Sequence, residues 1–196
     1  MTQSALIIGA GIVGVSTALS LARRGWDVKV VEKNHAVGCG STARTSSVIR
    51  CHYPRAEAIA LAHEGATLWA DWANYLKLEK ARAQYHATGV LFLMRQGAGG
   101  PPSESLGVKA EMDQNDLDER LRMMHEVGVE AILMGPKALC EHLPCFKFPE
   151  EDVVGIWEPN SGFVYPPVAS VEDLQQAAMA LGVQFYFETT VQGGQS

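Results

Sequence analysis

The chain has 196 residues, of which 47% are hydrophobic and 19% are charged, a composition typical of a globular protein that buries a sizeable core. Its formal charge of −6, without basic clusters, argues against nucleic acid or an anionic membrane as a partner. No apolar run reaches the length of a membrane helix, and the cysteines show no CxxC spacing, so we expect a cytoplasmic protein without a membrane span.

The first predicted elements are a strand, a glycine turn, a helix and a second strand. An apolar strand over 5–8 leads into Gly9-Ala10-Gly11-Ile12-Val13-Gly14, and a helical pattern then continues to Arg24. A second strand covers 27–31 and ends at Glu32. This order of elements is the fingerprint of a dinucleotide-binding unit.

Each residue of the glycine turn has a predicted task at the diphosphate of a dinucleotide. Gly9 permits the tight turn, Gly11 lets the backbone approach the diphosphate, and Gly14 lets the helix pack on the sheet. Ile12 and Val13 open the helix, where free N–H groups and a partial positive charge attract phosphate. We therefore predict that these residues bind the cofactor.

Glu32 is the predicted ligand of the adenosine ribose. It follows Gly14 by eighteen residues, where a carboxylate can accept hydrogen bonds from both ribose hydroxyls. The same charge would repel a 2′-phosphate, which argues against NADP. The neighbouring Lys33 is predicted to contact the adenosine end.

The middle of the chain alternates between polar loops and apolar elements. A polar stretch over 33–47 is predicted to be a loop, followed by a helix over 56–78 in which Trp69 and Trp72 serve core packing. A strand is expected over 88–94 and an exposed loop over 96–105.

Short elements continue to the end of the chain. Their predicted ranges are helix 116–127, strand 129–133, helix 136–142, strand 153–157, strand 162–164 and strand 183–187. Between the last two strands, Ser170-Val171-Glu172-Asp173 resembles a capping box that would begin a further helix.

Three segments have counterparts in a known family: Gly40-Ser41-Thr42-Ala43-Arg44, Val48-Ile49-Arg50-Cys51-His52-Tyr53 and Gly162-Phe163-Val164-Tyr165-Pro166. Together with the glycine turn, they resemble the FAD-dependent oxidoreductases of the D-amino-acid oxidase superfamily, in particular the sarcosine, dimethylglycine and glycine oxidase group. The resemblance extends over nearly the whole chain but only to the amino-terminal half of such enzymes.

The resemblance implies an α/β fold with two domains. Residues 1–82 and 150–196 would form a discontinuous Rossmann-like FAD-binding domain with a parallel sheet, and 83–149 part of a substrate domain with a mixed or antiparallel sheet. Family members are about twice as long. We therefore expect a fragment, a truncated product or one part of a split enzyme, inactive or impaired by itself and lacking a second half or partner subunit.

The segment after the acid is implied to contact the cofactor. The residues carried over from the family are Gly40, Ser41, Thr42, Ala43 and Arg44. Hydroxyl and backbone N–H groups suit phosphate and ribityl oxygens. An ordinary polar loop with a solvated arginine is the alternative. The segment has no histidine of the kind that carries covalent flavin in some relatives, so we expect noncovalent FAD.

Arg50 and His52 are the implied catalytic residues. In sarcosine-type oxidases the matching arginine helps to hold the substrate carboxylate, a task that suits its bidentate fork. A structural salt bridge is an equally open role for Arg50. His52 could tune the flavin or the substrate amine, or be a hydrogen-bonded histidine of the core.

The implied activity is oxidation of the C–N bond of a small amino acid or N-methyl amino acid, such as sarcosine, by hydride transfer to flavin. Oxygen and a carrier protein are both open as electron acceptors. The six histidines are dispersed without ligand spacing, so we expect no metal. Two alternatives remain open: an NAD-dependent Rossmann dehydrogenase, and a truncated nucleotide-binding module without catalysis.

Overall fold

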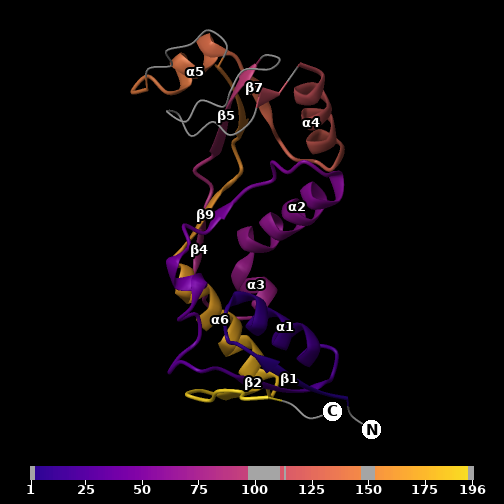
Figure 1. Cartoon of the computed structure of the whole chain (residues 1–196), viewed down its shortest axis with the longest axis vertical. Helices are drawn as coiled ribbons and strands as arrows, with labels where there is room; N and C mark the ends of the chain where they lie inside the picture. The colour runs from indigo at the N-terminus through magenta and orange to yellow at the C-terminus, as the bar shows by residue number, and fades with distance from the viewer. Residues whose placement is uncertain (1–2, 97–110, 113, 147–152, 194–196) are drawn as a thin grey trace. The chain divides into compact units, whose positions relative to one another are not determined.

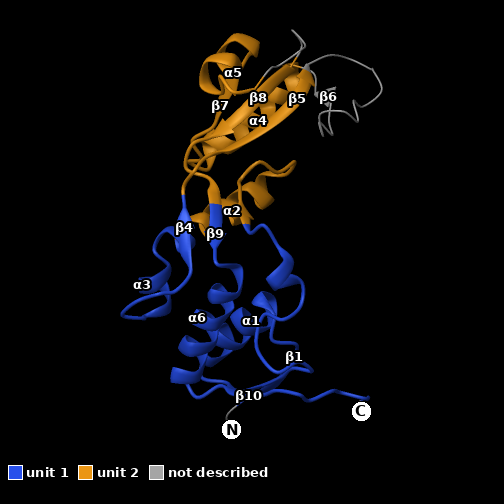
Figure 2. Cartoon of the chain, turned by 90° about the vertical axis from the view of Figure 1, so that its left-hand side faces the viewer, with its two compact units in different colours: residues 1–47, 68–86, 163–196 blue, residues 48–67, 87–162 orange. Residues whose placement is uncertain are grey.

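The computed structural model describes residues 3–96, 111–112, 114–146 and 153–193. Most of the predicted loop over 96–105 lies outside these ranges. The chain divides into two compact units, which are described separately below (Figure 2). Unit 1 comprises residues 1–47, 68–86 and 163–196, and unit 2 comprises residues 48–67 and 87–162.

Unit 1 is built on a three-stranded parallel sheet. Its strands are β1 (Ser4–Ile8), β2 (Asp27–Val31) and β10 (Gln184–Tyr186), with β2 in the centre. Val30 of β2 lies opposite both Ile7 of β1 and Phe185 of β10. The three strands predicted for the parallel sheet are thus confirmed.

Two helices cover one face of this sheet (Figure 1). They are α1 (Ile12–Ala22) and α6 (Pro167–Ala180), which pack against each other. Leu19 of α1 and Leu174 of α6 are almost fully buried, as is Val30 beneath them. The burial of these apolar side chains supplies the main stabilisation of unit 1.

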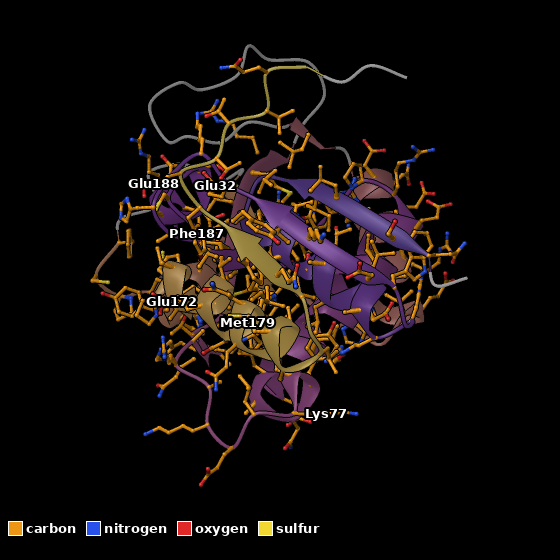
Figure 3. The ribbon with its side chains drawn as sticks, turned by 90° about the horizontal axis from the view of Figure 1, so that it is seen from below. Glu32, Lys77, Glu172, Met179, Phe187 and Glu188 are labelled. Atoms are coloured by element: carbon orange, nitrogen blue, oxygen red, sulfur yellow. The ribbon has the colours of Figure 1, made fainter. Side chains whose placement is uncertain are left out.

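The opposite face of the same sheet carries exposed apolar side chains. Leu6 and Ile8 of β1 are 60% and 68% exposed, and Tyr186 of β10 is 45% exposed. Within the described part of unit 1, no helix lies on this side, and Figure 3 looks onto it from below. Parallel sheets are normally covered on both faces.

Helix α6 begins earlier than predicted. Its first residue is Pro167, a position that suits proline because the first N–H of a helix needs no partner. Ser170 lies inside the helix and donates a hydrogen bond from Oγ to the Pro167 carbonyl at 2.6 Å. The predicted capping box is therefore wrong.

Asp173 of α6 joins three segments of unit 1. It is fully buried, and its carboxylate accepts hydrogen bonds from the backbone amides of Arg82 and Ala83 at 3.0–3.1 Å. It also accepts one from Trp72 Nε1 at 3.3 Å. These bonds satisfy the carboxylate in the core.

The helix predicted over 56–78 is two helices. α2 spans Ala56–Ala70 and α3 spans Trp72–Leu76, with Asp71 in a non-helical conformation between them. Core packing is confirmed for Trp72, which is 8% exposed and has its ring 4.0 Å from that of Trp69. Three short elements complete unit 1: the 3₁₀ helix η1 (Ser41–Arg44) and the antiparallel strands β4 (Gln84–His86) and β9 (Gly162–Tyr165).

Unit 2 contains a four-stranded mixed sheet in the order β6-β5-β8-β7. The strands are β5 (Val90–Gln96), β6 (Glu111–Met112), β7 (Ile132–Met134) and β8 (Val153–Glu158). β8 pairs antiparallel with β5 and β7, whereas β6 is parallel to β5. The predicted mixed sheet is thus confirmed, although β7 begins three residues later than expected.

The core of unit 2 joins this sheet to helices. The further elements are β3 (Val48–Ile49), α4 (Gln114–Glu126) and α5 (Pro136–His142). Leu117 and Met124 of α4 and Ile59 of α2 are fully buried with Ile156 of β8. Among the helices in the described ranges, none combines the length and apolarity needed to cross a bilayer.

Candidate cofactor site

The glycine turn is tightly closed between β1 and α1. Gly9 has φ +101°, which favours glycine, and its amide donates to the Val31 carbonyl at 2.8 Å. A Cβ on Gly14 would lie 2.0 Å from the Gly9 carbonyl oxygen. The turn and the helix therefore approach too closely for any side chain at Gly14, as predicted.

Gly11 is different, because the fold itself does not require a glycine there. Its φ of −80° is open to any residue, and a Cβ would meet only Thr42 Oγ1, at an ordinary 3.5 Å. Gly11 is the N-cap of α1, beside the helix N–H groups that have no partner within the helix. A cradle that a Cβ would fill, at a helix N-terminus, fits a diphosphate group.

The segment after Glu32 folds back onto the glycine turn. Gly38 donates its amide hydrogen to the Ala10 carbonyl at 2.9 Å. Thr42, which is 8% exposed, accepts a hydrogen bond from the Ile12 amide at 3.3 Å. The structure thus brings part of the predicted 40–44 segment to the first turn of α1.

The remaining predicted cofactor residues of this part of unit 1 are solvent-facing. Gly40, Ser41, Ala43 and Arg44 are exposed, as is Lys33. Val13 is 75% exposed although it is apolar. Thr42 therefore holds the segment in place, and its neighbours present an open polar surface.

Glu32 lies at the carboxyl end of the central strand, with its carboxylate turned to the glycine turn. Oε2 accepts from the Ala10 amide at 2.8 Å. Oε1 accepts from the backbone and side-chain nitrogens of Asn34, at 2.9 and 2.6 Å. Burial acts to raise the pKa of Glu32, but the hydrogen bonds from Ala10 and Asn34 and the charge of Lys33 outweigh it and lower the pKa.

The segment after β10 runs along the same end of the sheet. The Thr189 amide donates to the Glu32 carbonyl at 2.9 Å, and the Glu188 amide donates to the Asn34 carbonyl at 3.0 Å. Figure 3 shows Glu32 and Glu188 at this end of the sheet. Residues far apart in sequence therefore frame the predicted ribose position.

A groove of about 500 Å³ opens near this end of unit 1. It is lined by His35, Val37, Gln175, Met179 and Phe187, together with the Arg82–Glu172 ion pair. None of the predicted cofactor residues lines it. The groove is thus distinct from the cradle at Gly11.

Arg50 and His52 belong to unit 2. The Arg50 guanidinium lies 4.4 Å from the Tyr53 ring centroid and 5.3 Å from that of Phe92, and its Nη1 donates to the His52 carbonyl. Among the described residues, none of the ion pairs includes Arg50. The guanidinium is therefore oriented by aromatic rings and a carbonyl.

His52 is held as a neutral imidazole. Its ring centroid lies 4.6 Å from that of Phe92, and among the described residues its buried Nε2 has no hydrogen-bond partner. Burial first, and then the charges of Arg120 and Arg50, lower the pKa of His52 to about 4. A hydrogen-bonded core histidine was the alternative role for His52, but its Nε2 makes no hydrogen bond to the described residues.

Two residues at these sites were not predicted from the sequence. Asn34 binds Glu32, a local pattern that an asparagine two residues after an acid could have suggested. Glu158 is 1% exposed and accepts a hydrogen bond from the Cys51 amide at 2.7 Å. An acid at the end of the apolar strand Val153–Trp157 was the available signal.

A family model described as FAD dependent oxidoreductase (DAO) matches residues 4–196 of this chain. The match covers nearly all residues and includes the glycine turn, Glu32 and the 40–44 segment. The fingerprint indicates an adenine dinucleotide, and the family match identifies this dinucleotide as FAD.

Curated relatives with sequence similarity are bifunctional proteins of tRNA 5-methylaminomethyl-2-thiouridine biosynthesis, MnmC. That of Albidiferax ferrireducens is 33% identical over 102 residues, covering 51% of this chain and 16% of that protein. That of Pseudomonas putida strain GB-1 is 25% identical over 179 residues, covering 91% and 24%. The chain therefore spans less than a quarter of the length of these relatives.

Solved structures with the same fold include a dehydrogenase and two oxidases. L-proline dehydrogenase from P. horikoshii has a TM-score of 0.75 at 24% identity, covering 98% of this chain and 45% of that one. Glycine oxidase from Geobacillus kaustophilus has a TM-score of 0.69 at 19% identity, covering 97% and 48%. L-alpha-glycerophosphate oxidase from Mycoplasma pneumoniae, a structure with FAD bound, has a TM-score of 0.67 at 22% identity, covering 98% and 46%.

Proposed function

The chain belongs to the family of FAD dependent oxidoreductases, and from this premise we propose that unit 1 binds FAD noncovalently for the oxidation of an amine. The family is FAD-dependent, which favours FAD over the NAD that the glycine fingerprint left open. The specific substrate we propose is a small amino acid or N-methyl amino acid such as sarcosine, with its C–N bond oxidised. Cytoplasmic location is part of the same proposal.

The observation that carries the proposal is the cradle at Gly11. There the backbone permits any residue, yet a glycine leaves space beside Thr42 and the N-terminus of α1. We assign the diphosphate to this space and the adenosine ribose to Glu32, whose two carboxylate oxygens have about four acceptor positions and three described donors. Gly40, Ser41, Ala43 and Arg44 would complete the contacts.

Substrate recognition is assigned to the segment Arg50–His52 of unit 2. When bound, FAD supplies the electron acceptor for C–N oxidation. Arg50 would bind the substrate carboxylate with its forked guanidinium, which the rings of Tyr53 and Phe92 orient. His52, neutral above its pKa of about 4, would hold or accept a hydrogen bond near the substrate amine.

Replacing Gly11 by alanine and by valine tests the cofactor assignment. Both side chains would enter the proposed diphosphate space, so we expect FAD affinity to fall at least about tenfold, with circular dichroism unchanged. Gly65→Ala is the matched control, because a Cβ there meets nothing within 4 Å. Undiminished FAD binding by both Gly11 variants would contradict the assignment.

Dye reduction by the FAD-loaded chain tests the activity. Reduction with sarcosine or glycine, and a raised KM in Arg50→Lys, are the expected results. Bound FAD without reduction by any small amine would instead support the alternative of a non-catalytic nucleotide-binding module. The chain spans under half of the length of these solved relatives.

A second candidate substrate comes from the curated relatives. Their name contains a methylaminomethyl group, a secondary amine like that of sarcosine, but carried on a tRNA nucleoside. The formal charge of −6 disfavours a large contact with a phosphate backbone. Reduction of dye by undermodified tRNA, but not by sarcosine, would favour this candidate.

A further inference from the structure

Glu158 is a buried carboxylate at the end of β8 in unit 2. It is 1% exposed, and its Oε2 accepts two hydrogen bonds, one from the Cys51 amide at 2.7 Å and one from Ser161 Oγ. Among the residues that the structure describes, Oε1 has no donor within hydrogen-bond distance. Burying a carboxylate in this way is costly, so a hydrophobic residue would be expected unless the acceptor has a task.

Cys51, whose amide donates the 2.7 Å bond to Glu158, lies between the two proposed catalytic residues. Cys51 is 3% exposed, and its neighbours on either side are Arg50 and His52. At 2.7 Å, the hydrogen bond from its amide to Glu158 is at the short end of the usual range for N–H···O bonds. The bond therefore fixes the backbone from which both side chains project.

The acceptor Glu158 lies in a strand that is paired along its length with β5. Glu158 pairs with Val90 across β5 and β8, and Phe92 lies opposite Ile156 in the same ladder. The Ser161 carbonyl also accepts the Gly89 amide at 2.8 Å, which ties the turn after β8 to the start of β5. The hydroxyl that binds Glu158 is thus held by the same pair of strands.

One strand pair therefore holds the segment in two ways. Phe92 of β5 contacts the His52 ring at 4.6 Å and lies 5.3 Å from the Arg50 guanidinium, so it packs against the side chains. Glu158 of β8 binds the backbone between them. The two anchors act on one three-residue segment.

We propose that Glu158 is a positioning residue, which fixes Arg50 and His52 for the substrate through its hydrogen bond to the Cys51 amide. This inference rests on the proposed roles of Arg50 and His52. Glu158 is 1% exposed and is not expected to touch substrate.

The test replaces Glu158 by methionine and by glutamine in the whole 196-residue chain. Methionine has a similar length but no strong acceptor, whereas the glutamine oxygen can still accept the Cys51 amide. Ile156→Val is the matched control, because it weakens the core of the same strand without touching this hydrogen bond. The readout is the pKa of His52, measured by NMR and assigned with His52→Asn.

We expect Glu158→Met to raise the pKa of His52 from about 4 toward its ordinary value of 6.5, since His52 would leave its buried position near Arg120. Glu158→Gln and Ile156→Val should leave it near 4. An unchanged pKa in Glu158→Met, or an equal rise in all three variants, would overturn the proposal.

A second measurement applies if Glu158→Met does not fold. The Cys51 amide should then show slow hydrogen exchange in the wild-type chain and in Glu158→Gln, and fast exchange in either would overturn the inference. In the FAD-loaded enzyme, Glu158→Met should also raise KM more than it lowers kcat. Failure of the proposed function is distinguishable, because an unaltered KM in Arg50→Lys would contradict the role of Arg50 and leave the NMR result unaffected.

Discussion

The amide of Ile12 donates a hydrogen bond to Thr42 Oγ1 at 3.3 Å, linking the first turn of α1 to the segment that follows the ribose acid. Thirty residues separate the two partners. The bond places a hydroxyl beside Gly11, whose missing side chain leaves the space open. The cradle is therefore a product of two chain segments, and the glycine turn supplies only one of its walls.

Gly14→Ala should destabilise unit 1 independently of any cofactor. The new Cβ would lie 2.0 Å from the Gly9 carbonyl oxygen, so the helix would have to move from the sheet. We expect a loss of about 1–3 kcal/mol in the free energy of unfolding, measured by urea titration. The same change at Gly65, which meets no atom within 4 Å, should be neutral or stabilising, and an equal loss there would contradict the explanation.

Asp173→Ala should be among the most damaging changes in unit 1. It would leave the Trp72 indole and the amides of Arg82 and Ala83 without their buried acceptor. We expect a loss of about 2–4 kcal/mol by urea unfolding. The adjacent Glu172→Ala removes only an exposed ion pair with Arg82 and should cost less than about 1 kcal/mol. Equal losses would show that burial of the carboxylate is not the cause.

Glu32 should make stability fall at low pH. Its pKa is lower in the folded chain than its ordinary value of 4.5, so its stabilising effect is complete above that value and is lost as the pH falls through the folded pKa. Urea unfolding at pH 7 and at pH values below 4.5 should therefore show a smaller acid-induced loss in Glu32→Gln than in the wild type. Parallel curves for the two proteins would refute this role.

His52 should act on stability in a different pH window. Its pKa is about 4 when folded and 6.5 ordinarily, so the unfolded chain binds more protons between these values. The stability that the neutral imidazole contributes is complete above pH 6.5 and is lost as the pH falls toward 4. The variant His52→Asn should show a flatter dependence of the urea midpoint over this window.

The control for His52 is His35→Asn, which replaces an exposed histidine of unit 1. It should keep the wild-type pH dependence between pH 6.5 and 4. If both variants flatten the curve equally, the dependence does not come from burial of His52.

Much of unit 1 is encoded locally. The order of strand, glycine turn, helix and acid predicted β1, α1 and β2, because each element carries its own periodicity and its own end signals. The close approach at Gly14 was also predicted from that motif. Such features depend on neighbours within a few residues, which a sequence displays directly.

The errors arose where distant residues decide. The start of α6 was misplaced because Asp173, which looks like a capping acid, instead binds Trp72 and Arg82 about ninety to a hundred positions away. The helix over 56–78 was too long because the break at Asp71 has no glycine or proline to mark it. The sequence shows the acid Glu158 at the end of a strand but not its hydrogen bond, since its partner Cys51 is 107 positions away.

The bare side of the parallel sheet has a practical consequence for handling this chain. An exposed hydrophobic patch lies next to the strand edges and is formed by Leu6, Ile8 and Tyr186. Such a patch beside unpaired strand edges promotes aggregation. The isolated chain should therefore be handled at low concentration. The fluorescence of ANS should increase when the probe binds to this patch. The substitutions Leu6→Lys and Ile8→Lys should increase the solubility of the chain.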